Sequence, residues 1–323
     1  MSTTRSEPAI LAEDLRKSYP GRGAVLDGLD LEVSAGSVHG LIGANGAGKT
    51  TAVRILTTLV RLDSGRARVA GRDVATDPRG VREHISMAGQ YAAVDEVLSG
   101  RQNLQMFAQL DHLRPGAARR RTAELLERFD LVAAADRPAH RYSGGMRRRL
   151  DLAVSLIRRP HVLFLDEPTT GLDPRSRAEV WKAVRELAHT GTTVLLTTQY
   201  LNEADRLCSQ VSLVGAGRIV AEGTPADLKA RIGGSRVEVR VPAHHDVEHA
   251  AATLSTAVEA VATVDRTTRE IALPMRGGTA SLVRLARALD HAGVRAEDVS
   301  LRPPDLDEVF LHLTSTVVEG AAG

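Results

Sequence analysis

The sequence is poor in cysteine, lysine and aromatic residues. Its 323 residues contain a single cysteine, Cys208, and aromatic residues make up only 3% of the chain. One cysteine excludes an internal disulfide and suits a reducing compartment. With so few aromatic rings, the core must be built mainly from Leu, Val, Ile and Ala. Arginine carries most of the positive charge, because the only lysines are Lys17, Lys49, Lys182 and Lys229.

Long apolar runs are also missing. No stretch approaches the roughly 20 apolar residues that a transmembrane helix needs, and residues 1–19 contain charges throughout, so we expect neither a membrane span nor a secretory signal. The net charge of +2 is too small to indicate nucleic-acid binding. We therefore expect any membrane association to come through a partner. At 43% apolar content the chain is long enough for two domains.

A glycine-rich segment, Gly43 to Thr50, reads Gly-Ala-Asn-Gly-Ala-Gly-Lys-Thr. It follows an apolar run and precedes a helical pattern, which places it where a strand turns into a helix. Its backbone N–H groups can surround the β-phosphate of a nucleoside triphosphate, and Lys49 adds a cation. The hydroxyl of Thr50 can bind Mg²⁺. A chance match is the alternative for a lone segment. The candidate binding residues here are Gly43, Asn45, Gly46, Gly48, Lys49, Thr50 and Thr51.

A second segment, residues 162–167, ends in an acidic pair. Four apolar residues before Asp166 predict a strand buried on both faces, with its carboxylate at the carboxyl edge of a parallel sheet. Asp166 can hold Mg²⁺ there through water. Glu167 can accept a proton from the water that attacks the γ-phosphorus. Together the two segments predict a nucleoside triphosphatase.

A third segment, Tyr142-Ser143-Gly144-Gly145-Met146, precedes an amphipathic helical pattern. The start of a helix with small residues is suited to an anion. The order of the three segments resembles the ATP-binding cassette family, whose signature reads Leu-Ser-Gly-Gly-Gln at this point. That resemblance implies ATP and Mg²⁺ as ligands. It also implies a homodimer in which Ser143, Gly144 and Gly145 contact the γ-phosphate of a nucleotide held by the other copy.

Further landmarks of that family follow in order. The resemblance implies that Tyr19 stacks on adenine, that Gln90 senses Mg²⁺ and reports to a permease, and that the loop with Asp173 crosses the dimer interface. Taken alone, Tyr19 is better interpreted as a half-buried anchor and Gln90 as a surface amide. Most members carry a histidine where this chain has Gln199, which can donate a hydrogen bond but cannot carry a proton. We therefore expect Glu167 to activate water and Gln199 to position the phosphate.

Several longer stretches of the sequence are similar to the daunorubicin/doxorubicin-resistance type of ATP-binding subunit. They surround the signature and the acidic pair, and they extend to residues 306–311 near the C-terminus. This resemblance implies the motor of an exporter of hydrophobic antibiotics, at the cytoplasmic face of the membrane and bound to a separate permease. Two alternatives are a soluble cassette ATPase that acts on ribosomes or DNA and a chiefly regulatory protein. The first usually has two cassettes or a long insertion, which this sequence lacks.

The pattern predicts an α/β domain over residues 1–233, with a mixed sheet core, a β-rich layer and a helical subdomain at about 91–142. Core strands are expected at 162–165, 193–197 and 211–214. Residues 234–323 read as βαββαβ, the ferredoxin-like arrangement, which we interpret as a regulatory or assembly domain. Two arginine runs, 119–121 and 147–149, are interpreted as solvated helix faces, with a charged partner as the alternative.

Overall fold

The computed structural model describes residues 7–89, 93–231, 236–244, 246–274, 278–302 and 305–310. The chain divides into two compact units, Met1–Pro225 and Ala226–Gly323. The expected boundary near residue 233 falls in the segment 232–235, outside the described residues. In the described part of the chain, no helix has the length and apolar character to cross a bilayer.

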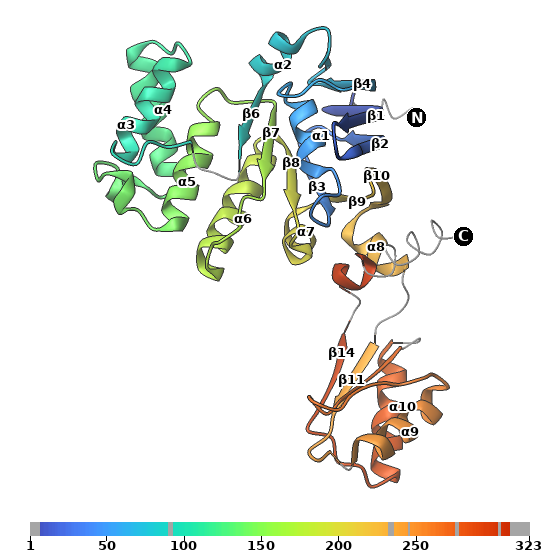
Figure 1. Cartoon of the computed structure of the whole chain (residues 1–323). Helices are drawn as coiled ribbons and strands as arrows, with labels where there is room; N and C mark the ends of the chain where they lie inside the picture. The colour runs from blue at the N-terminus through green and yellow to red at the C-terminus, as the bar shows by residue number, and fades with distance from the viewer. Residues whose placement is uncertain are drawn as a thin grey trace, which may run out of the picture. The chain divides into compact units, whose positions relative to one another are not determined.

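A six-stranded sheet forms the centre of the first unit (Figure 1). Its strand order is β10 (Arg218–Gly223), β9 (Gln210–Gly215), β3 (Val38–Gly43), β8 (Thr193–Thr198), β7 (Val162–Asp166) and β6 (Ile85–Ala88). Neighbours from β9 to β6 run parallel, whereas β10 pairs antiparallel with β9, so the sheet is mixed. Every residue of β3, β7 and β8 is buried, as expected for strands covered on both faces.

This topology positions the candidate site. The carboxyl ends of neighbouring parallel strands meet at one edge of a sheet, where ligands bind in open α/β folds. Here that edge brings together the ends of β3, β7 and β8. Three helices follow these strand ends along the chain: α1 (Lys49–Leu56) after β3, α6 (Pro174–His189) after β7 and α7 (Leu201–Leu207) after β8. Helix α5 (Gly144–Ser155) precedes β7.

A second, antiparallel sheet of four strands lies beside the first. Its order is β2 (Gly23–Val33), β1 (Ile10–Tyr19), β4 (Ser64–Val69) and β5 (Arg72–Asp73). Buried residues of this layer share one hydrophobic cluster with α1, for example Leu15, Leu29 and Val53. Helix α2 (Pro78–His84) begins with Asp77 as its N-cap. The predicted β-rich layer is confirmed.

The helical part of the unit contains α3 (Gly100–Leu110) and α4 (Pro115–Arg128), with short 3₁₀ turns at Val132–Ala134 and Ala139–Arg141. Helix α3 starts with a capping box in which Ser99 and Gln102 satisfy each other's backbone N–H groups. In Figure 1 these helices lie next to α5, away from the strand β1.

The second unit starts at Ala226, within α8 (Pro225–Arg231). It continues in the order β11 (Arg236–Arg240), α9 (Asp246–Val258), β12 (Thr263–Asp265), β13 (Glu270–Pro274), α10 (Gly278–His291) and β14 (Asp298–Arg302). Its sheet has the order β12-β13-β11-β14, with all pairs antiparallel. Val237, Ile271 and Leu285 belong to its own hydrophobic core. The arrangement fits the expected ferredoxin-like pattern.

Two expectations differ from the structure. Strand β10 was not predicted, because the residues around it were interpreted only as glycine turns that end the domain. The arginine run 147–149 is not a solvated helix face, since Arg148 is only 8% exposed and Arg147 and Arg149 form ion pairs with Glu96 and Glu179.

Candidate nucleotide-binding and hydrolysis site

The glycine-rich loop joins β3 to α1, as predicted, and its glycines serve different purposes. A Cβ on Gly43 would lie 2.5 Å from the carbonyl oxygen of Val214. Gly48 has a φ of +110°, and its Cβ would lie 2.7 Å from Leu26 Cδ2. Both positions therefore require glycine because of packing. Gly46 also has a positive φ, yet a Cβ there would meet no atom within 4 Å.

The loop borders a cavity of about 570 Å³. Six of the thirteen described lining residues come from the loop and the first turn of α1, and Glu167 reaches the cavity from the end of β7. The lining residues are Arg22, Ala24, Val25, Asn45, Gly46, Gly48, Lys49, Thr50, Thr51, Arg54, Glu167, Ala216 and Gly217. All the predicted loop residues except Gly43 thus line one cavity together with the predicted general base.

Lys49 is the first residue of α1 and is buried. Its ammonium donates to the carbonyl oxygens of Gly43, at 2.7 Å, and Ala44, at 3.0 Å. Burial lowers the pKa of Lys49, while Glu167 and Asp166 act in the opposite direction. An ammonium has three donors, and the described residues take two of them, so a further N–H can reach an anion in the cavity.

The acidic pair follows β7, and its two side chains diverge. Asp166 is buried, and the hydroxyl of Thr197 on β8 donates to its Oδ1. Glu167 has a φ of +48°, a left-handed conformation that is costly for a residue with a side chain. Its N–H donates to the carbonyl oxygen of Thr197 at 3.0 Å, and the hydroxyl of Thr170 donates to its Oε2 at 3.2 Å. The backbone therefore turns at Glu167, which lines the cavity, whereas Asp166 is bonded to Thr197 and is not among the described residues that line it.

Two further predicted residues lie outside the described lining of the cavity, and a third is not described. Tyr19 ends β1 half-buried, with the Lys17 ammonium 5.6 Å from its ring centroid, and it is absent from the described lining of the cavity. Gln199 follows β8 directly and is exposed. Gln90 lies outside the described residues.

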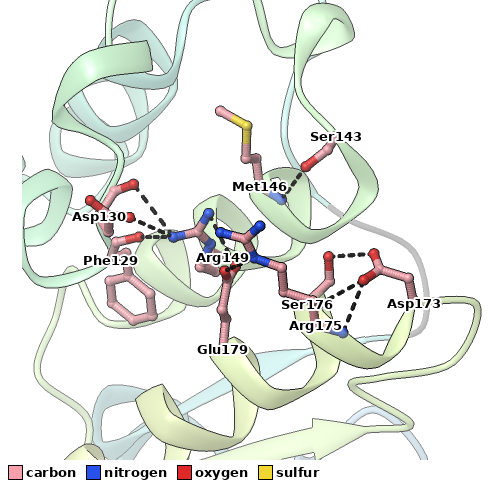
Figure 2. Close-up of polar contacts among 9 residues, drawn as sticks. All are labelled: Phe129, Asp130, Ser143, Met146, Arg149, Asp173, Arg175, Ser176 and Glu179. Atoms are coloured by element: carbon pink, nitrogen blue, oxygen red, sulfur yellow. Dashed lines mark hydrogen bonds and ion pairs between the residues drawn. The ribbon is translucent and has the colours of Figure 1, made fainter.

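The signature segment forms the start of α5 (Figure 2). Ser143 is the N-cap, and its hydroxyl accepts from the N–H of Met146 at 3.2 Å. A Cβ on Gly145 would lie 2.3 Å from Ser176 Oγ, so the missing side chain lets α5 approach α6 closely. Gly144 and Ser143 are exposed.

Asp173 lies beside the signature segment as the N-cap of α6 (Figure 2). Its Oδ2 accepts from the Ser176 hydroxyl at 2.6 Å, and its Oδ1 accepts from the N–H groups of Arg175 and Ser176. Neither Asp173 nor the signature residues are among the described residues that line the Lys49 cavity. The turns that carry Ser143 and Asp173 are thus exposed and are separate from the described lining of the cavity.

Arg149 holds the signature helix α5 to its neighbours (Figure 2). It donates to the carbonyl oxygen of Phe129 at 2.9 Å and lies 3.4 Å from Glu179 Oε2. It therefore links α5 to the end of α4 and to α6.

Arg22 and Arg54 were missed as members of the cavity. Arg22 follows β1 in a turn closed by a hydrogen bond from its N–H to the Tyr19 carbonyl oxygen, and Arg54 lies one turn into α1. Arginine is common throughout this chain, so residue type alone gave no signal for either one. Arg54 lies four residues after Thr50 and three after Thr51 on one helix, and this spacing could have indicated it.

The site combines a glycine loop between a buried strand and a helix, a buried lysine, and an acidic pair at the end of another strand of the same sheet. These features define a P-loop nucleoside triphosphatase. The family model described as ABC transporter matches residues 26–170. The daunorubicin resistance ATP-binding protein DrrA2 of Streptomyces coeruleorubidus is 56% identical, over 95% of this chain and 95% of its own. The daunorubicin/doxorubicin resistance ATP-binding protein DrrA of Streptomyces peucetius is 48% identical, over 96% and 94%.

Solved structures agree with these relatives. The structure of cbiO1 from Clostridium perfringens, part of the ABC transporter complex cbiONQ, is similar with a TM-score of 0.66 and 26% identity, over 70% of this chain and 92% of that chain. The chain belongs to the ATP-binding cassette (ABC) transporter family and is an ATPase of its P-loop fold. The resemblance to the daunorubicin/doxorubicin-resistance type of ATP-binding subunit is confirmed.

Proposed function

We propose that this chain is the ATP-hydrolysing motor of an exporter that moves a hydrophobic drug or antibiotic through a separate membrane permease. The support is the likeness to drug-resistance ATP-binding proteins over nearly the full length of both chains, the second unit included. The chain would act at the cytoplasmic face of the membrane, held there by the permease. The ferredoxin-like unit would serve regulation or assembly.

The active form is a homodimer in this proposal. Ser143 and Asp173 lie on exposed turns outside the cavity of their own chain. A helix start such as that of α5 favours an anion by about 0.3–1 kcal/mol, so one contact of this kind is weak and closure needs many. A second copy would bring its Ser143 turn to the triphosphate held at Lys49, and the Asp173 turns would meet across the interface.

Residues in and next to the cavity have different roles in binding the phosphates and the metal ion. Lys49 and the backbone N–H groups of the loop bind the phosphates, with Arg22 and Arg54 as further cations at the cavity wall. Thr50 in the cavity offers a hydroxyl oxygen, and Asp166, next to Glu167 at the end of β7, offers a carboxylate oxygen. These are ligands that Mg²⁺ prefers, so they fit this ion, with Gln90 as a third expected ligand. Bound there, Mg²⁺ would neutralise charge on the β- and γ-oxygens.

Hydrolysis then depends on Glu167, which lines the cavity and would take a proton from the attacking water. Gln199, at the end of the neighbouring strand β8, would donate a hydrogen bond to the γ-phosphate, and Tyr19 would contact adenine. The single observation that carries the proposed ATP hydrolysis is that Glu167 and the Lys49 loop share one cavity.

Replacing Glu167→Gln tests this assignment. Loss of a positioned general base commonly costs about 10²- to 10⁴-fold in rate, so we expect ATP turnover to fall by that amount while nucleotide affinity is retained. Turnover is followed by phosphate release and affinity by titration with a fluorescent ATP analogue. Glu83→Gln is the matched control, because Glu83 is exposed on α2 and forms an ion pair there with Arg79. A wild-type rate in Glu167→Gln would contradict the assignment.

Transport is tested by co-purification from membranes. We expect the chain to co-purify with the permease encoded beside it, and its ATPase rate to rise when a hydrophobic drug is added to the complex. Co-purification with ribosomes or DNA in place of a membrane protein would favour the alternative cassette ATPase.

A further inference from the structure

Two buried charged side chains hold the two residues that follow Glu167. Arg148 Nε donates to the carbonyl oxygen of Pro168 at 2.8 Å, and this side chain is 8% exposed. The hydroxyl of Thr169 donates to Glu203 Oε1 at 2.9 Å, and Glu203 is 0% exposed. Neither residue lines the ATP cavity in the part of the chain that the structure describes.

The two side chains come from helices that start at the proposed phosphate contacts. Arg148 lies on α5, whose N-cap is Ser143. Glu203 lies on α7, which begins two residues after Gln199. The loop after Glu167 is therefore tied to the signature helix on one side and to the helix after Gln199 on the other.

Both anchors have other partners, yet their bonding is incomplete. Arg148 also pairs with Asp151 at 2.9 Å and donates to the Gly89 carbonyl oxygen at 2.7 Å. Glu203 Oε1 also accepts from Trp181 Nε1 at 2.9 Å. Among the residues that the structure describes, one guanidinium nitrogen of Arg148 and Glu203 Oε2 are buried and have no hydrogen-bond partner. Buried polar atoms without partners cost free energy of folding, so stability alone does not account for this network.

Glu167 needs such anchors because of its backbone. A non-glycine residue with positive φ persists only where its surroundings hold it in place. We propose that Arg148 and Glu203 are positioning residues: by holding Pro168 and Thr169, they direct the Glu167 carboxylate into the cavity and couple it to helices α5 and α7. The inference rests on the assignment of Glu167 as general base. When ATP-driven closure displaces the Ser143 turn, Arg148 would then transmit that movement along α5 to Glu167 of the same chain.

Two variants separate positioning from structural support. Thr169→Val and Trp181→Phe each remove one hydrogen bond to the same oxygen, Glu203 Oε1, but only Thr169 belongs to the loop after Glu167. We expect kcat to fall about tenfold in Thr169→Val, the rate equivalent of one hydrogen bond to a charged group, with KM for ATP within about twofold. Trp181→Phe should keep kcat within about twofold. Equal kcat values in the two variants would overturn the proposal.

Arg148→Lys extends the test to the other anchor. Lysine keeps a positive charge beside Asp151 but loses the Nε donor to Pro168, so we expect a lower kcat at unchanged KM. Arg147→Lys, next to it on α5 and paired with Glu96, should leave kcat unchanged, and an equal loss in both variants would also overturn the proposal. Glu167→Gln is measured in parallel. A wild-type rate there means that the proposed base is wrong, whereas a slow Glu167→Gln with equal Thr169→Val and Trp181→Phe rates means that only the positioning role is wrong.

Discussion

At the residue scale, the glycines of the phosphate loop show how one motif combines separate requirements. Gly43 and Gly48 are confined by neighbouring atoms, whereas the Cβ position of Gly46 is open. Chain folding therefore requires glycine at two of these positions. At Gly46 the need is conformational, and the open space lets the backbone approach a phosphate.

The variant Gly48→Ala measures the packing requirement. Alanine at a positive φ costs about 1–2 kcal/mol, and the contact with Leu26 adds overpacking of about 1–3 kcal/mol. We expect a loss of about 3 kcal/mol in the free energy of unfolding, measured by urea denaturation. Gly36→Ala is the control, because Gly36 has a φ of +68° with nothing within 4 Å of the Cβ position. If both variants lose the same stability, packing at Gly48 does not matter.

Site residues that a phosphate-binding motif requires by their chemical type could be predicted from the sequence. Residues proposed to act by holding the backbone or a hydroxyl group of another loop could not. Lys49, Asp166 and Glu167 were found because a phosphate site needs a cation and paired acids at set spacing. Arg148 and Glu203 bind main-chain or hydroxyl groups distant in sequence, at Pro168 and Thr169. No local pattern marks such a partner, and Arg148 lay within a run interpreted as solvated.

At the element scale, the pairing of β3 with β9 buries a titratable side chain. His39 on β3 is 1% exposed, and its Nε2 lies 2.8 Å from Ser212 Oγ on β9. Burial lowers the pKa of His39 to about 4. The imidazole is therefore neutral in the folded protein at neutral pH, and its protonation competes with folding.

This burial predicts a pH dependence of stability. The unfolded chain takes up a proton at about pH 6.5 and the folded chain at about pH 4, so the contribution is complete above pH 6.5 and is lost as the pH falls toward 4. The difference corresponds to about 3 kcal/mol. We expect the free energy of unfolding of the wild type to fall more than that of His39→Gln over this range, measured by urea denaturation at each pH. Parallel curves for the two proteins would contradict the prediction.

The elements that could be predicted were those with a strong periodic or apolar pattern. The buried strands β7, β8 and β9 were expected within one residue of their observed bounds at each end. Strand β10 was missed because it pairs antiparallel at the sheet edge and carries charged residues at Arg218 and Glu222. Its place depends on a partner strand, which local patterns do not reveal.

At the scale of the whole molecule, the proposed dimer places two demands on Ser143. Its hydroxyl caps α5 within the chain, and in the proposal it also faces the γ-phosphate of the other copy. Aspartate is an equally good N-cap but brings a negative charge to that phosphate. A variant at this position can therefore keep the fold while opposing closure.

Ser143→Asp in the Glu167→Gln background tests this demand. We expect stability close to that of Glu167→Gln alone, because the cap is kept, and loss of the ATP-dependent dimer in analytical ultracentrifugation, because the carboxylate repels phosphate. Ser143→Asn, a neutral cap of similar size, should dimerise far better than the aspartate variant. Full dimerisation of Ser143→Asp would show that this turn does not approach the nucleotide.

The most direct measurement of the central claim is a structure of Glu167→Gln with Mg²⁺ and ATP. The account predicts two copies around two nucleotides, with the γ-phosphate of each bound at Lys49 of one copy and lying about 3 Å, hydrogen-bond distance, from the hydroxyl of the partner subunit's Ser143. A nucleotide bound at Lys49 with the Ser143 turns of all neighbouring copies far from it would contradict the account.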